Sequence, residues 1–237
     1  MIAVSSMSDI GCARPSNEDS FGIFAPAIYV VADGLGGHAA GEVASSMVVA
    51  AVRDMADSGT SVDTAALQHV LLQANQQVLA AAAENPAYEG MGSTATVLHL
   101  DEETGMAYYA HVGDSRLYLL RRGVLRQISR DHSYVEELVT QGKLSEEEAQ
   151  HHPRKNLLMR AVGVEQEMQV DSDLFPLEHG DRFLLATDGL TNMVPDEDLC
   201  RLLGGSVEEV AASMVERALE AGGRDNITAI AVAYEPS

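Results

Sequence analysis

The feature that most restricts how this chain can fold is a short apolar run that ends on an acid and a small residue. Three such runs end at Asp33-Gly34, Asp114-Ser115 and Asp188-Gly189. Two further acidic positions, Asp225 and the pair Glu18-Asp19, directly precede apolar runs. An ionised carboxylate beside a hydrophobic core is unfavourable by several kcal/mol unless it is paired or binds a metal. The pattern therefore predicts strands whose ends bring several acids together.

The charge of the chain indicates what could neutralise these acids. The sequence has 36 acidic and 15 basic residues, a formal net charge of −21, so nucleic acid and anionic membranes are not expected partners. An anionic substrate would need bound cations or a well-placed arginine. A set of oxygen ligands suits a hard cation such as Mg²⁺ or Mn²⁺. The alternative for any single acid is an Asx turn at the end of a strand.

Hydrophobic periodicity predicts two helices followed by short strands. Residues 41–56 carry an apolar stripe through Val43, Met47, Ala50 or Ala51, and Met55. Asp63 is placed to cap a second helix that continues to Asn85. Strands are expected at residues 20–24, 28–32, 93–100, 106–112, 116–120, 124–128, 168–174, 181–186 and 227–234. The four strands between residues 93 and 128 are expected to form an antiparallel meander. Two more helices are expected at 195–203 and 206–221.

This order favours an α+β fold in which antiparallel sheets are covered by helix pairs. The 237 residues fit one domain, with residues 133–164 as a charged, partly helical flap outside the sheets. The chain contains no apolar run of the length that spans a membrane, and its start is unlike a secretory signal. Cys12 and Cys200 are isolated and are expected to be reduced, so a cytoplasmic location is expected.

Two other kinds of site are poorer matches. Residues 34–39 fit the loose glycine pattern of dinucleotide-binding loops, but Asp33 would repel a pyrophosphate and hairpins follow instead of a βαβ unit. A cysteine-based phosphatase needs an arginine six positions after its cysteine. Glu18 and Ser206 stand at those positions.

Seven short motifs occur in an order that resembles a known enzyme family. They are Arg14-Pro-Ser-Asn-Glu-Asp19, Val31-Ala-Asp-Gly-Leu-Gly-Gly-His38, Gly92-Ser-Thr-Ala-Thr96, Val112-Gly-Asp-Ser-Arg116, Asn156-Leu-Leu-Met-Arg-Ala-Val-Gly163, Ala186-Thr-Asp-Gly189 and Arg224-Asp-Asn-Ile-Thr228. Together they resemble the PPM (protein phosphatase 2C) family of metal-dependent serine/threonine phosphatases, in its compact bacterial form. The resemblance implies a central β-sandwich flanked by helix pairs. It also implies the hydrolysis of phosphoserine and phosphothreonine.

The resemblance also implies metal ligands. Asp33 corresponds to a carboxylate that bridges two Mn²⁺ or Mg²⁺ ions, and Asp188 and Asp225 to further ligands. Gly34 would contribute its backbone carbonyl, with Glu18 or Asp19 binding directly or through water, and Asp114 would help to hold a third, weaker metal. Two adjacent cations can acidify a shared water for in-line attack on phosphorus.

Two further residues are candidates for handling the phosphate ester. The planar fork of Arg14 matches two phosphate oxygens, although Arg14 would also fit a surface arginine paired with Glu18. His38 has a pKa suited to protonating the departing serine or threonine oxygen, and its alternative is to cap the following helix.

The expected function is thus a protein phosphatase, acting as a monomer on targets of a bacterial serine/threonine kinase. The flap would lie near the active site and could contact protein substrates through residues 151–155. Two other classes of function remain open: a binding module that keeps the fold but has lost catalytic activity, and a nucleotide-binding protein.

Overall fold

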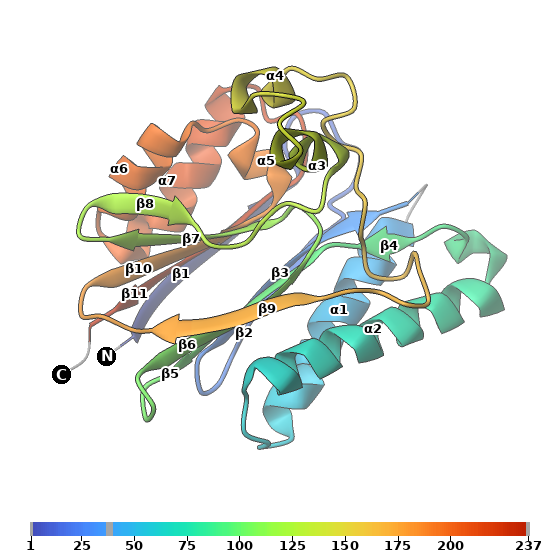
Figure 1. Cartoon of the computed structure of the whole chain (residues 1–237), viewed down its shortest axis with the longest axis horizontal. Helices are drawn as coiled ribbons and strands as arrows, with labels where there is room; N and C mark the ends of the chain where they lie inside the picture. Colours follow the sequence, from blue (N-terminus) through green and yellow to red (C-terminus); the bar gives the residue numbers. More distant parts are fainter. Residues whose placement is uncertain (1, 37–39, 236–237) are drawn as a thin grey trace.

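The computed structural model describes residues 2–36 and 40–235, which form two stacked antiparallel sheets with helices on both outer faces (Figure 1). The strands are β1 (Ile2–Asp9), β2 (Asp19–Phe24), β3 (Ile28–Leu35), β4 (Gly92–Ser93), β5 (Ala95–Asp101), β6 (Met106–Val112), β7 (Arg116–Arg121), β8 (Val124–Gln127), β9 (Asp171–Pro176), β10 (Asp181–Ala186) and β11 (Ile227–Tyr234). One sheet has the order β1-β11-β10-β7-β8. The other has the order β2-β3-β5-β6-β9, with β4 paired to β3.

The helices cover the outer faces of the two sheets. They are α1 (Ala40–Asp57), α2 (Thr64–Glu84), the 3₁₀ turn η1 (Pro86–Tyr88), α3 (Tyr134–Thr140), α4 (Glu146–Gln150), α5 (Asp188–Thr191), α6 (Asp196–Leu203) and α7 (Val207–Glu220). Helices α1 and α2 pack on the sheet that contains β3, and α6 and α7 pack on the sheet that contains β11. None of the described helices is long and apolar enough to cross a bilayer.

A third apolar layer lies between the two sheets. Its fully buried members include Leu98 from one sheet and Leu117, Phe183 and Ile230 from the other. Because strands alternate the sides on which their side chains lie, each sheet contributes one face to this layer and the other face to its helix pair. The predicted α+β sandwich is therefore confirmed.

The second predicted helix is confirmed together with its cap. The Asp63 side chain accepts a hydrogen bond of 2.8 Å from the backbone nitrogen of Ala66, which satisfies a free donor at the start of α2. Leu67, Leu71 and Val78, which lie on its predicted apolar stripe, are fully buried.

Other sequence predictions were wrong in detail. The most buried face of α1 runs through Ala44, Val48 and Val52, whereas Val43 and Met47 of the predicted stripe are half-buried and pack against the same core. Small residues on this face let the helix approach the sheet closely, and the periodicity was assigned to the larger neighbouring side chains. Strand β1 was not predicted because it is a half-buried edge strand with serine at three of its positions.

The predicted meander is also wrong, and the difference bears on the site. Strands β5 and β6 pair in one sheet and β7 and β8 in the other, so the chain crosses between sheets after Val112. The crossing begins at Gly113, which has a φ of +107°. Asp114 lies in this crossing.

Replacing Gly113 by alanine is expected to lower the free energy of unfolding by about 3 kcal/mol. A Cβ atom at this position would lie 2.6 Å from Cβ of Thr94, and the positive φ adds backbone strain. The matched control is Gly105→Ala, because Gly105 has a φ of +67° with nothing within 4 Å of its Cβ position. Urea denaturation measures both variants. Equal losses of unfolding free energy in the two variants would show that the close approach to Thr94 does not determine the effect of Gly113→Ala.

Candidate active site

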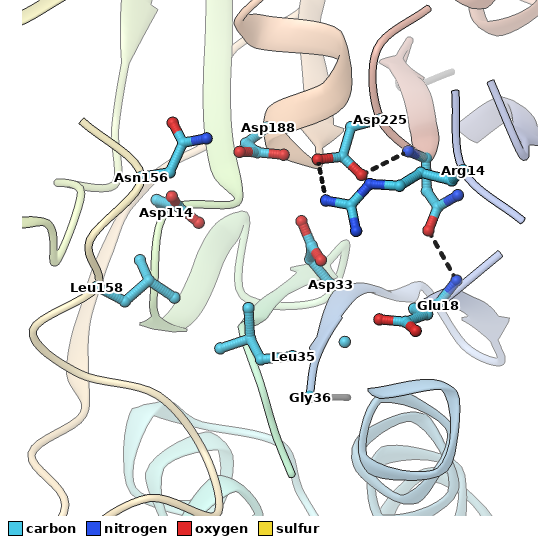
Figure 2. Close-up of a pocket in the computed structure, with 12 residues that line it drawn as sticks. Arg14, Glu18, Asp33, Leu35, Gly36, Asp114, Asn156, Leu158, Asp188 and Asp225 are labelled. Carbon is cyan, nitrogen blue, oxygen red and sulfur yellow. Dashed lines mark hydrogen bonds and ion pairs between the residues drawn. The ribbon is translucent and has the colours of Figure 1, made fainter. Parts of the chain in front are cut away.

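Most of the acids singled out in the sequence lie around one pocket, at the same end of both sheets (Figure 2). The pocket has a volume of about 220 Å³. The predicted site residues that line it are Arg14, Glu18, Asp33, Gly34, Asp114, Asp188 and Asp225. The structure thus brings together residues that are up to 211 positions apart in the chain.

Both sheets contribute to this pocket. Asp33 lies near the end of β3 in one sheet, and Asp188 is the first residue of α5, directly after β10 of the other. Asp225 lies just before β11, and Asp114 lies where the chain crosses from β6 to β7. Glu18 directly precedes β2. The pocket is therefore formed by strand ends and does not belong to either sheet alone.

Thr94 fixes two of these acids relative to each other. Its backbone nitrogen donates to the carbonyl of Asp33 at 2.9 Å, and the backbone nitrogen of Asp33 donates to Oγ1 of Thr94 at 2.8 Å. The same Oγ1 lies 2.7 Å from Oγ of Ser115, next to Asp114. Thr94 therefore ties the backbone at Asp33 to the crossing that carries Asp114.

Asp19 does not line the pocket but lies buried beside it, opposite Asp33 in the β2–β3 pairing. Its Oδ2 atom accepts hydrogen bonds from the hydroxyls of Thr187 and Thr228, at 2.8 and 2.7 Å. Its Oδ1 atom is buried and has no hydrogen-bond partner among the described residues. Burial raises the pKa of Asp19 to about 7. One carboxylate oxygen is thus left uncompensated.

The pocket carboxylates raise one another's pKa. Burial, followed by the charges of Asp19 and Asp188, holds the pKa of Asp33 well above its ordinary value. Burial, then the charge of Asp225, raises the pKa of Asp188 to about 6. Burial is also the main cause of the raised pKa of Asp114. Close, buried carboxylates cannot all be ionised unless positive charge joins them.

Arg14 is the single basic residue among the described residues that line this pocket. Its Nη2 atom donates to Oδ2 of Asp225 at 2.7 Å, and the Arg14 side chain is 48% exposed. That hydrogen bond raises the pKa of the guanidinium, and the charges of Glu18 and Asp33 act in the same direction. Figure 2 shows the guanidinium directed into the pocket. The alternative of a surface arginine paired with Glu18 is wrong, since the ion pair is made with Asp225.

Sequence reasoning assigned no role to Asn226, which lines the pocket and holds its entrance loop. The side-chain amide donates to the carbonyls of Ile10 and Ser16, at 2.9 Å each, and its Oδ1 accepts from the nitrogen of Glu18 at 2.8 Å. The signal that could have pointed to Asn226 was its place in the motif Arg224-Asp-Asn-Ile-Thr228, directly after Asp225. These bonds position the segment that carries Arg14 and Glu18.

The donor set fits a hard divalent cation in chemistry. The pocket lining supplies five carboxylates against one guanidinium, and the unpartnered Oδ1 of Asp19 lies buried beside it. Within residues 2–36 and 40–235, however, no three acidic, histidine or cysteine side chains converge closely enough to hold one ion as they stand. Rotation of a carboxylate about its side-chain bonds is a small change, whereas an unbalanced buried charge is strongly unfavourable, so these side chains remain suited to a cation.

One predicted residue cannot be placed. His38 lies outside the described residues, so its role as a proton donor remains a prediction from the sequence.

Comparisons with known proteins agree with one another. The model of the family described as protein phosphatase 2C matches residues 16–229. The chain is 39% identical over 236 residues to the serine/threonine phosphatase stp of Listeria innocua, covering 95% of this chain and 93% of that protein. These proteins are similar over nearly their whole lengths.

Solved structures show the same similarity. The crystal structure of the Mycobacterium tuberculosis serine/threonine phosphatase PstP/Ppp has a TM-score of 0.92 and 38% identity, with 99% of both chains covered. The catalytic domain of the phosphatase PstP in complex with two manganese ions has a TM-score of 0.90 and 37% identity, again with 99% of both chains covered.

Proposed function

The chain belongs to the protein phosphatase 2C family, and we therefore propose that its pocket around Asp33 hydrolyses phosphoserine and phosphothreonine residues of phosphoproteins. The protein is a metal-dependent serine/threonine phosphatase of the bacterial type. The observation that supports the pocket as its active site is the cluster of five carboxylates, facing one guanidinium, at the shared end of both sheets.

We propose that Asp33, Asp188 and Asp225 hold two divalent cations. The Gly34 carbonyl and Glu18 or Asp19 would complete their binding, and Asp114 would help to hold a third. The preferred ions are Mn²⁺, as found with the PstP catalytic domain, or Mg²⁺. When bound, such ions supply positive charge that polarises phosphoryl oxygens and lowers the pKa of water.

The residues of the chain would bind and orient the phosphate ester. Arg14 offers a planar fork for two phosphate oxygens, and its ion pair with Asp225 holds the guanidinium at the pocket. Leu35 and Leu158 give the lining an apolar part that limits access of bulk water. His38 is the proposed proton donor to the serine or threonine oxygen that leaves.

The function is tested by measuring phosphate release from phosphoserine and phosphothreonine peptides, with Mn²⁺ and with EDTA. We expect rapid release with Mn²⁺ and none with EDTA. Turnover that is undiminished by chelation would exclude this function. A chain that binds phosphopeptide but releases no phosphate under either condition would be a binding module. Binding of NAD or ATP, measured by titration, would favour the nucleotide-binding alternative.

Replacing Arg14 by alanine is expected to lower kcat/KM on phosphopeptides by about 10- to 100-fold, the effect of removing a charge-assisted hydrogen bond. Arg14→Lys keeps the charge but loses the fork, so we expect only partial recovery. The control is Arg53→Ala, which removes an arginine of similar exposure (55%) paired with Asp54 on α1. If Arg14→Ala retains wild-type kcat/KM, Arg14 does not bind the phosphate.

A further inference from the structure

The flap, residues 133–164, carries two adjacent basic residues that stand out in so acidic a protein. Arg154 and Lys155 make no ion pair with a carboxylate of residues 2–36 or 40–235, whereas nine of the thirteen other arginines and lysines do. With 36 acidic residues in the chain, an unpaired Arg-Lys pair leaves a local positive charge on the surface.

This basic pair lies on an ordered turn. The backbone nitrogen of Arg154 donates to Nδ1 of His152 at 3.1 Å, and that of Lys155 donates to the carbonyl of His152 at 3.1 Å. The guanidinium of Arg154 lies over the ring of Tyr134, 5.8 Å from its centre. The backbone of both residues and the guanidinium of Arg154 are therefore held in place, and the pair does not lie at the end of a loose loop.

The turn leads directly to the wall of the active-site pocket. Asn156 and Leu158 line the pocket, and Figure 2 shows them on the side opposite Arg14. The segment is anchored by a hydrogen bond of 2.7 Å from the nitrogen of Met159 to the carbonyl of His132. Lys155 directly precedes Asn156, so the basic pair lies next to the pocket wall in the chain.

The same segment exposes apolar side chains on its other side. Leu157 and Met159 are each 47% exposed, so they alternate along the segment with Asn156 and Leu158. Next to the pocket wall, the outer surface of this segment thus offers two cations followed by two apolar side chains. We call Arg154, Lys155, Leu157 and Met159 the flap rim.

We propose that the flap rim binds the polypeptide on one side of the phosphorylated residue and favours substrates with aspartate or glutamate there. The proposal rests on the proposed function of the pocket. Its occupant is the substrate itself, because the rim is continuous with the pocket wall and carries charge opposite to an acidic peptide. Elsewhere the net charge of −21 would repel such a peptide, so the preference depends on this local reversal.

The test uses phosphoserine peptides of equal length with acidic, neutral or basic residues, placed either before or after the phosphoserine. At low salt, we expect kcat/KM to be about fivefold higher for the acidic than for the neutral peptide on one of the two sides. The difference should lie mainly in KM and should shrink as salt is added. The double variant Arg154→Gln/Lys155→Gln should lose the preference, and Lys155→Glu should invert it.

The matched control is Arg126→Gln/Lys143→Gln. It removes one arginine and one lysine that are exposed and likewise unpaired within the described part of the chain, and Lys143 also lies in the flap. This control should keep the preference for acidic peptides. Equal kcat/KM on acidic and neutral peptides, or an unchanged preference in the Arg154/Lys155 variants, would overturn the proposal. Absence of Mn²⁺-dependent turnover on every peptide would instead overturn the proposed function.

Discussion

Asp33→Asn is expected to lower Mn²⁺-dependent hydrolysis of phosphoserine peptides on the order of a thousandfold. Asp33 is the acid whose pKa is raised by the charges of four other carboxylates, those of Asp19, Asp114, Asp188 and Asp225, in addition to burial. It therefore lies where positive charge is most needed. Asparagine keeps the size of the side chain and removes only its charge. Phosphate release at saturating Mn²⁺ measures the loss.

In the absence of metal, Asp33→Asn is expected to make the folded protein more stable. With EDTA present at pH 8, Asp33→Asn should melt at a higher temperature than the wild type, because one buried, repelled carboxyl group has been removed. The rise in melting temperature caused by Mn²⁺ should become smaller. The control, Asp54→Asn, changes an aspartate whose side chain is 73% exposed, and should change neither activity nor melting. A variant that is less stable in EDTA, or that remains active, would contradict the role of Asp33.

Removal of divalent ions is expected to abolish activity. It is also expected to make the folded protein less stable as the pH rises. The folded-state pKa is about 7 for Asp19 and about 6 for Asp188, against an ordinary value of 3.8. The folded protein therefore holds protons that the unfolded chain has already released, and folding becomes less favourable as pH rises. The stabilisation is complete below about pH 3.8 and is lost between that pH and the folded-state values.

Thermal melts in EDTA between pH 5 and pH 8 measure this effect. Each such group lowers the free energy of unfolding on the order of 1 kcal/mol per pH unit within its window, so the melting temperature should fall as the pH rises from 5 to 7. With saturating Mn²⁺ the trend should reverse, because cations compete with protons for the same oxygens. A flat profile in EDTA would mean that these carboxyl groups are not buried against one another.

Much of the fold could be predicted because its signals are local. The cap at Asp63, the apolar stripe of α2 and the apolar runs of β10 and β11 depend on residues a few positions apart. The acids of the pocket were found for a related reason, since an acid at the end of a buried run is a local anomaly. Sequence alone could then predict that Asp33, Asp188 and Asp225 belong to one site.

What the sequence could not reveal depends on pairing between distant segments. Strands β6 and β7 follow each other closely, and only their partners β9 and β10 show that they lie in different sheets. Asn226 and Thr94 stand in two of the quoted motifs, but the motifs did not show their structural role, which comes from the backbone groups that reach them in three dimensions. The ion pair of Arg14 with Asp225 likewise joins opposite ends of the chain.

The position of the pocket at the seam of the sandwich has a mechanical consequence. Asp33 belongs to one sheet, and Asp188 and Asp225 lie next to strands of the other. An ion bound by all three would therefore link the two sheets. A small displacement of one sheet relative to the other would separate these carboxylates while the helices and strands remained intact. Looser packing between the sheets would therefore first raise the metal concentration needed for activity, and would lead to unfolding only at a later stage.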